Sequence, residues 1–136
     1  MSKINIKYLI IIWIIVIFIL SSIPGNDLQK LPKFKIPHLD KIVHFVMYFT
    51  LQFLVLTEYY KNYAKKISFI KLLSFSLSIS VSYGLLMEIL QNYFFISRTG
   101  SLFDFLANTI GAIFGSIAVI LLIKTKWFVK LIGIKN

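Results

Sequence analysis

The chain has no cysteine, few charged residues and very few acidic ones. Without cysteine it can form no disulfide, no thiolate metal site and no cysteine nucleophile. Only 15% of its residues are charged, whereas soluble domains have about a quarter; 58% are hydrophobic, and the mean hydropathy is +0.83. These proportions exclude an ordinary soluble domain and indicate a chain that lies mostly in lipid.

Four long apolar stretches account for this hydropathy. They cover about residues 6–23, 39–60, 69–94 and 102–123. A helix needs about 20 residues to cross the roughly 30 Å hydrocarbon core of a bilayer, and lipid requires the backbone groups to bond internally. The sequence therefore predicts an all-α, polytopic integral membrane protein: one domain, 1–136, forming a small bundle of about four transmembrane helices.

The first apolar stretch has some features of a signal peptide, and a turn follows it. Lys3 and Lys7 precede an apolar run, as in a signal peptide, but residues 21–24 offer no small-x-small cleavage site. We therefore expect an uncleaved first helix. The turn residues 24–27 end it, and Pro32 and Pro37 should keep the next segment from becoming helical.

The formal net charge of +10 comes from basic residues placed between the apolar runs. In that position they act as topology signals and contacts for anionic lipid, and we predict no nucleic-acid partner. If the N-terminus is cytoplasmic, ten of the fifteen Lys and Arg residues face the cytoplasm. The positive-inside rule thus predicts a multi-pass protein of the plasma membrane with both termini in the cytoplasm.

The few polar residues within the spans are the candidates for function. Of the five acidic residues, Asp27 and Glu58 are interpreted as solvated or lipid-surface charges. The other three fall at the predicted outer ends of the helices, and together with nearby polar side chains they form a predicted binding or functional cluster: Asp40, His44, Glu88, Gln91, Arg98, Asp104 and Asn108. Ionisable residues inside membrane spans are costly, and they mark functional sites by default.

Helical spacing places many of these residues on shared faces. Asp40, His44 and Tyr48 follow one another at intervals of four, and Gly84, Glu88 and Gln91 share a face of the third span. The only arginine, Arg98, has a planar fork that suits a carboxylate or a phosphate. A structural interpretation is also open for two of these residues. Asp40 could serve as the N-cap of its helix, and His44 could lie at the membrane interface.

The fourth span opens with Ser101-x-x-Asp104, which fits a capping box. Asp104, Asn108, Gly111 and Gly115 then form one stripe. Gly111-x-x-x-Gly115, like Gly84 in the third span, predicts close helix packing, either within the chain or in a homo-oligomer. We further predict that Arg98 and Asp104 form a direct salt bridge or grip one anionic ligand between them.

In this order and spacing, four blocks resemble the VanZ-like membrane proteins, a family named for a protein associated with resistance to the glycopeptide teicoplanin. The blocks are 21–25, Asp40-Lys41-Ile42-Val43-His44-Phe45 with Tyr48, Tyr83-Gly84 with Glu88 and Gln91, and Arg98-x-x-Ser101-x-x-Asp104-x-x-Ala107-Asn108-x-x-Gly111. The resemblance implies a helical membrane protein with a role at the cell envelope. It supplies no catalytic mechanism.

Three functions remain open on the sequence. The cluster binds a cell-envelope component, such as a membrane lipid, a lipid-linked precursor or an anionic polymer. Alternatively it is an enzyme site, with Glu88 or Asp104 as the general base, His44 as a proton carrier and Arg98 as a clamp. The third reading is purely structural. No helix carries a His-x-x-x-His or Glu-x-x-His pair, so we predict neither a metal nor a cofactor.

Overall fold

The computed structural model describes residues 5–24 and 38–134 of the chain. In these two ranges the protein is entirely helical, with no strand. The long helices are α1 (Ile6–Ser22), α3 (Leu39–Tyr63), α4 (Phe69–Tyr93) and α5 (Leu102–Leu122), followed by the short α6 (Lys126–Leu131). The loop predicted around Pro32 and Pro37 lies outside the described residues.

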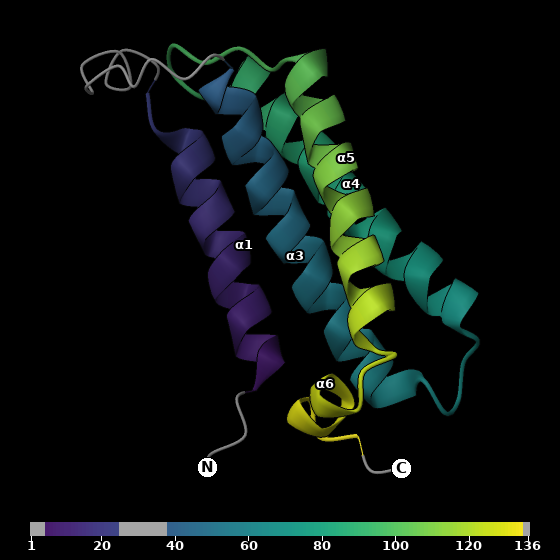
Figure 1. The fold of residues 1–136 in the computed structure, drawn as a ribbon. Helices are drawn as coiled ribbons and strands as arrows, with labels where there is room; N and C mark the ends of the chain where they lie inside the picture. Colours follow the sequence, from purple (N-terminus) through teal and green to yellow (C-terminus); the bar gives the residue numbers. More distant parts are fainter. Residues whose placement is uncertain (1–4, 25–37, 135–136) are drawn as a thin grey trace.

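The long helices run alternately up and down as an antiparallel bundle (Figure 1). Three of them, α3, α4 and α5, are long and apolar enough to cross a membrane, and α1 is a shorter apolar helix of 17 residues. The predicted small helical membrane bundle is thus confirmed. Side chains such as Ile12, Phe75 and Phe114 are exposed on its outside, where a bilayer would cover them.

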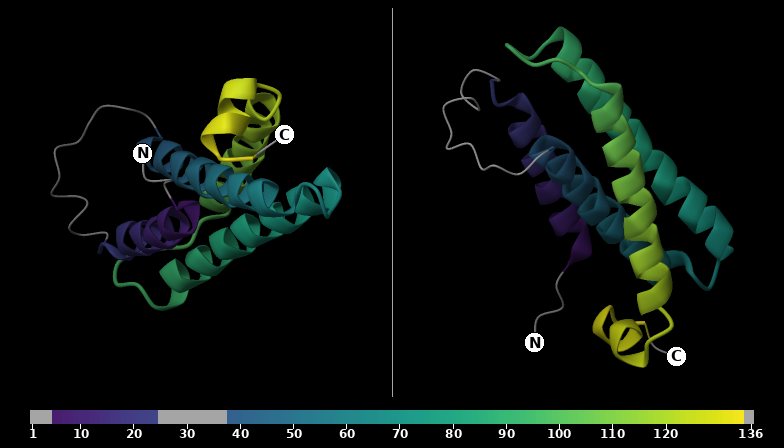
Figure 2. Two further views of the ribbon diagram at one scale, coloured as in Figure 1. Left: turned by 90° about the horizontal axis from the view of Figure 1, so that it is seen from below. Right: turned by 45° about the horizontal axis from the view of Figure 1, so that its top comes forward.

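Helix α3 is central: it contacts each of the other three long helices, and it packs against them more extensively than any other helix does (Figure 2). Its closest partner is α5. A Cβ atom on Gly111 would collide with the carbonyl oxygen of Phe45, and one on Gly115 would collide with that of Phe49. The two glycines therefore let the backbones of α3 and α5 touch, within the chain rather than between copies.

A buried polar hub lies in the middle of the bundle. The amide of Gln52 on α3 is fully buried and donates to the hydroxyls of Ser76 on α4 at 3.0 Å and Ser116 on α5 at 2.9 Å. Its oxygen accepts from Ser80 at 2.8 Å. With no water to satisfy an amide at this depth, these three serines are what make Gln52 tolerable there.

Helix α1 is attached by hydrogen bonds to backbone carbonyls. The indole of Trp13 donates to the carbonyl of Met47 at 2.9 Å, and the Tyr83 hydroxyl donates to that of Ile14 at 2.9 Å. The apolar core between them contains Ile17, Leu51 and Met87 among its buried residues. These contacts hold α1 against α3 and α4.

Helix α6 was not predicted from the sequence. It lies across the foot of the bundle, at the end opposite the α4–α5 connection (Figure 1). Gly133, with φ of 80°, ends it in a Schellman motif, in which Gly133 donates to Lys130 and Ile134 donates to Val129. Six residues are too few to show an apolar period in the sequence.

Candidate functional site

The upper end of the bundle in Figure 1 gathers the start of α3, the end of α4 and the start of α5. At its centre is a buried triad of side chains, His44, Glu88 and Asn108, one from each helix. Asn108 joins the other two: its nitrogen donates to Oε1 of Glu88 at 3.1 Å, and its oxygen lies 3.0 Å from Nδ1 of His44. Nδ1 of His44 is 3.7 Å from Oε1 of Glu88.

The order of donors in this triad follows from chemistry. An ionised carboxylate only accepts hydrogen bonds, so the NH₂ group of Asn108 must face Glu88 and its oxygen must face His44. Nδ1 of His44 then carries a hydrogen and donates a hydrogen bond to the oxygen of Asn108. The other ring nitrogen, Nε2, makes no hydrogen bond in the described part of the chain and is not among its fully enclosed unpaired atoms.

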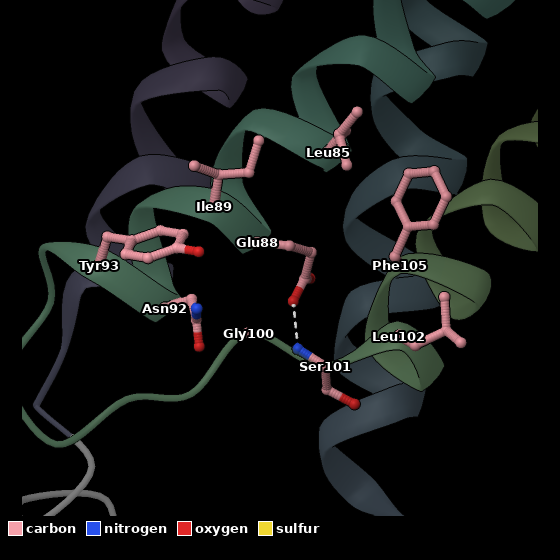
Figure 3. Close-up of a pocket in the computed structure, with 9 residues that line it drawn as sticks. All are labelled: Leu85, Glu88, Ile89, Asn92, Tyr93, Gly100, Ser101, Leu102 and Phe105. Atoms are coloured by element: carbon pink, nitrogen blue, oxygen red, sulfur yellow. Dashed lines mark hydrogen bonds between the residues drawn. The ribbon is translucent and has the colours of Figure 1, made fainter.

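The second carboxylate oxygen of Glu88 is held by the loop that leads into α5. Oε2 accepts a hydrogen bond of 3.0 Å from the backbone N–H of Ser101, the residue that caps α5 (Figure 3). A Cβ on Gly100 would collide with the carbonyl oxygen of Glu88, so only glycine lets the loop approach this closely. The carboxyl group of Glu88 thus lies at the N-terminus of α5, where the helix dipole favours a negative charge.

This arrangement changes the role predicted for Ser101 and Asp104. Ser101 is the N-cap residue, but its side chain makes no capping bond. In a capping box the residue three positions later would accept from the N-cap backbone N–H. Glu88 of another helix takes that bond instead. The expected capping box is therefore absent, and Asp104 is free to pair elsewhere.

Asp104 pairs with Lys41 of α3 rather than with Arg98. The Lys41 ammonium lies 3.2 Å from Oδ1 of Asp104 and 2.7 Å from Oδ2 of Asp40. Within the described residues, the Arg98 side chain makes no ion pair or hydrogen bond; only its backbone N–H is bonded, to Phe95. The direct Arg98–Asp104 salt bridge is thus not formed, and a ligand held by both stays a prediction.

The remaining predicted residues lie outside the triad. Asp40 is exposed at the start of α3, and among the described residues its side chain pairs with Lys41. Gln91 is buried but faces α1, where it donates to the Ser21 carbonyl at 3.3 Å. Gly84 packs against Tyr48 and Asn108. Of the seven cluster residues, the structure brings His44, Glu88 and Asn108 together, and it pairs Asp104 with Lys41 at the same end of the bundle.

Two polar residues, Glu58 and Tyr48, each have a buried oxygen with no partner among the described residues. Glu58, interpreted as a solvated charge, is only 9% exposed; Asn62 donates to its Oε1 at 2.7 Å, and its Oε2 has no partner within the described residues. The hydroxyl of Tyr48, one turn below His44, is also buried without a described partner. Tyr48 lies on the predicted face, and its ring packs beside that of Tyr83.

A pocket of about 310 Å³ opens beside Glu88 between α4 and α5 (Figure 3). Its wall is mainly apolar, and its lining residues are Leu85, Glu88, Ile89, Asn92, Tyr93, Gly100, Ser101, Leu102 and Phe105. The sequence analysis missed this wall, because apolar residues that line a pocket have the same pattern as apolar residues that face lipid. Gly100 before a helix start was the one available signal.

These features define a class of protein: a multi-pass helical membrane protein with a buried polar triad at one end of its bundle and a pocket beside it. A family model adds to this description. The VanZ/LLP1 model matches residues 6–124, which include all four long helices and the whole triad, so the chain belongs to the VanZ/LLP1 family. No curated protein and no solved structure matches it significantly.

Proposed function

We propose that the protein binds an amphiphilic component of the cell envelope in the pocket beside Glu88, and that this binding contributes to glycopeptide resistance. The observation that carries the proposal is a buried carboxylate, held by Asn108 and Ser101, at the edge of an apolar pocket. A site of about 310 Å³ is within the range of small-ligand pockets. Membership of the VanZ/LLP1 family supports the link to resistance.

The pocket favours a ligand with an apolar chain and a polar head. Leu85, Ile89 and Leu102 of its wall are themselves 49%, 43% and 71% exposed, so the pocket is open to the lipid side of α4 and α5. A polyprenyl or acyl chain could enter there directly from the bilayer. The head would then reach Glu88 without passing through water.

The polar end of the pocket sets the chemistry of the head group. Each oxygen of Glu88 already accepts one hydrogen bond, and a carboxylate has about four acceptor positions. The positions left over suit a hydroxyl or an amine of the ligand. Arg98 lies two residues before the pocket residue Gly100, and its guanidinium has no described partner, so it is available for a phosphate. A lipid-linked sugar phosphate or a hydroxyl-bearing phospholipid combines these features.

Binding is favoured over catalysis by the order of groups in the triad. An amide stands between His44 and Glu88, and it does not relay protons as an acid–base pair would. Ser101 uses its backbone N–H, not its hydroxyl, to contact Glu88, so no base activates that hydroxyl. A catalytic variant of the proposal would rely on Nε2 of His44, which has no described partner.

The distribution of charge supports a location in the plasma membrane with the pocket toward the outer leaflet. Most described lysines lie at the α6 end of the bundle, away from the triad. By the positive-inside rule that end is cytoplasmic, together with both termini. The pocket is then on the side where lipid-linked envelope intermediates and glycopeptides meet.

A binding experiment in nanodiscs tests the proposal. The probes are a polyprenyl phosphate, the same chain carrying a pyrophosphate-linked disaccharide, and phosphatidylglycerol. We expect one of them to raise the melting temperature of the wild-type protein, and Leu85→Trp, which fills the pocket, to abolish the shift. Ile110→Trp is the matched control, because Ile110 is similarly exposed at 47% but does not line the pocket.

Drug susceptibility is measured in cells that carry the same variants at equal abundance. We expect Leu85→Trp to lose glycopeptide protection and Ile110→Trp to keep it. Equal binding and equal protection by the two variants would refute the proposal. Chemical conversion of a probe, lost in His44→Gln, would identify an enzyme instead.

A further inference from the structure

The end of the bundle opposite the triad has a surface of its own, formed by α6 and the lysines around it. Helix α6 is attached by its inner side: Phe128 and Ile132 are 4% and 7% exposed, and the Phe128 ring meets that of Phe53 with centroids 6.1 Å apart. It follows α5 after three residues. A helix that lies across the bundle at the end of a membrane span is at the level of the lipid head groups.

The outer side of α6 is both apolar and basic. Trp127 and Leu131, spaced four residues apart, are 60% and 67% exposed. Lys126 and Lys130, also four apart, form an exposed stripe beside them. An aromatic and an aliphatic side chain next to two ammonium groups match the boundary between acyl chains and phosphates.

The charge around α6 is strongly one-sided. In the described ranges, only one acidic residue, the buried Glu58, lies at this end of the bundle. The basic residues there all belong to helix ends, connections or α6: Lys7, Lys61, Lys65, Lys66, Lys71, Lys124, Lys126 and Lys130. At the triad end, by contrast, Lys41 and Arg98 face three described carboxylates. Among the described residues, positive charge is therefore concentrated at the α6 end of the bundle.

We propose that this surface, formed by α6 and the adjoining lysines, binds anionic phospholipid head groups of the leaflet next to it. Each lysine near an anionic membrane surface favours such contact. A dissolved polyanion would bind the lysines but would leave Trp127 and Leu131 in water. A bilayer would bind the lysines with its phosphates and cover Trp127 and Leu131 with its acyl chains. Phosphates of the bilayer would sit against Lys124, Lys126 and Lys130 while Trp127 enters the upper acyl region.

Lipid-selective quenching of tryptophan fluorescence tests this surface directly. The protein is placed in bilayers of phosphatidylglycerol and phosphatidylcholine at one fixed ratio, with brominated chains on one lipid or on the other. The contribution of Trp127 is the difference between the wild type and Trp127→Phe, which leaves Trp13 and its bond to Met47 intact. We expect bromine on phosphatidylglycerol to quench Trp127 about twofold more strongly, or better, than bromine on phosphatidylcholine.

Two controls make the result specific. The combined variant Lys124→Gln, Lys126→Gln and Lys130→Gln should reduce the preference to parity, as should high salt, because both remove the electrostatic attraction. A reporter at the other end, Phe103→Trp in the Trp127→Phe protein, should show no such preference; Phe103 is 68% exposed and does not line the Glu88 pocket. Equal quenching of Trp127 by both lipids would overturn the proposal, as would quenching by neither. The outcome does not depend on the Glu88 pocket.

Discussion

Asn108 and Glu88, twenty residues apart in the sequence and on different helices, are joined by a buried hydrogen bond of 3.1 Å. The same amide faces His44, so a single side chain orders two titratable groups from two other helices. Because Asn108 bonds to both residues, a substitution of Asn108 should disturb both of them.

Asn108→Ala should destabilise the bundle by about 2 kcal/mol or more, because it removes a donor from a buried carboxylate and the partner of His44. Asn108→Asp should cost more still, since it places two carboxylates in contact. Unfolding of the purified protein by titration with a denaturing detergent measures both. Thr109→Ala is the control, because the Thr109 hydroxyl bonds only to its own helix, at Phe105. Equal stability of Asn108→Ala and Thr109→Ala would contradict the arrangement.

The pairing of Lys41 with Asp104 predicts the result of a double-mutant cycle. Lys41→Gln and Asp104→Asn should be coupled by up to about 1 kcal/mol, a value limited by the 34% exposure of the Lys41 side chain. Arg98→Gln and Asp104→Asn should be additive, because no bond joins them. Thermal unfolding of the four proteins in each cycle gives the coupling. A larger coupling for Arg98 than for Lys41 would restore the salt bridge predicted from the sequence.

Gln52→Leu should be mild although Gln52 is fully buried. Ser76 and Ser116 also donate to carbonyls of their own helices, at Leu73 and Ala112, so only Ser80 loses its partner. Leucine has nearly the same volume, and replacing a buried amide by an apolar group of similar shape is often close to neutral. We expect a loss of about 1 kcal/mol or less by thermal unfolding. A loss as large as that of Asn108→Ala would mean that the hub itself holds the helices together.

Tyr48→Phe removes a single hydroxyl group, so its effects on stability and on function can be compared in one variant. The Tyr48 hydroxyl is buried without a described partner, so removing it should leave stability unchanged or raise it slightly. Abundance, melting temperature and drug susceptibility are measured on the same variant. Lost protection at full stability would show that the hydroxyl contacts the ligand, and a loss of stability would show that it has an internal partner.

Alanine at the glycines of the helix interfaces should destabilise the protein to different degrees, most at Gly111 and less at Gly84. Gly111→Ala should be strongly destabilising, by about 2 kcal/mol or more, because the Phe45 backbone carbonyl cannot move aside. At Gly84 the nearest atom to an added Cβ is Cε1 of Tyr48 at 3.2 Å, and a ring can shift by a few tenths of an ångström. The higher helix propensity of alanine offsets part of that cost. The abundance of the two variants in membranes checks the order, and equal tolerance of both would contradict it.

Much of the fold was predictable because hydropathy and turn residues determine where a membrane helix begins and ends. The predicted spans 39–60 and 102–123 differ from α3 and α5 by at most three residues at any end. The placement of His44 and Glu88 near one end of the bundle followed from the alternating direction of the predicted spans and from their positions within them. Identification of the family from its motif residues agrees with the family model.

The pairing of side chains was less predictable, because it depends on rotation and depth between helices. Arg98 is close to Asp104 in sequence, yet Lys41 from another helix reaches Asp104. The exposed position of Asp40 reflects its place in the first turn of α3, where no neighbouring helix covers it. Gln52 continues the His44–Tyr48 face by one more turn, but nothing in the sequence around a neutral amide in an apolar run indicates that serines of two other helices will surround it.

The tight approach of Gly100 to Glu88 also limits how the length of this chain can change. One residue of extended chain spans about 3.3–3.6 Å, more than the entire 3.0 Å bond between Ser101 and Glu88. An insertion or deletion within residues 94–99 would therefore shift the start of α5 out of register with α4. Family members that keep the glutamate and the glycine should keep the number of these six residues, even where residues other than Arg98 differ.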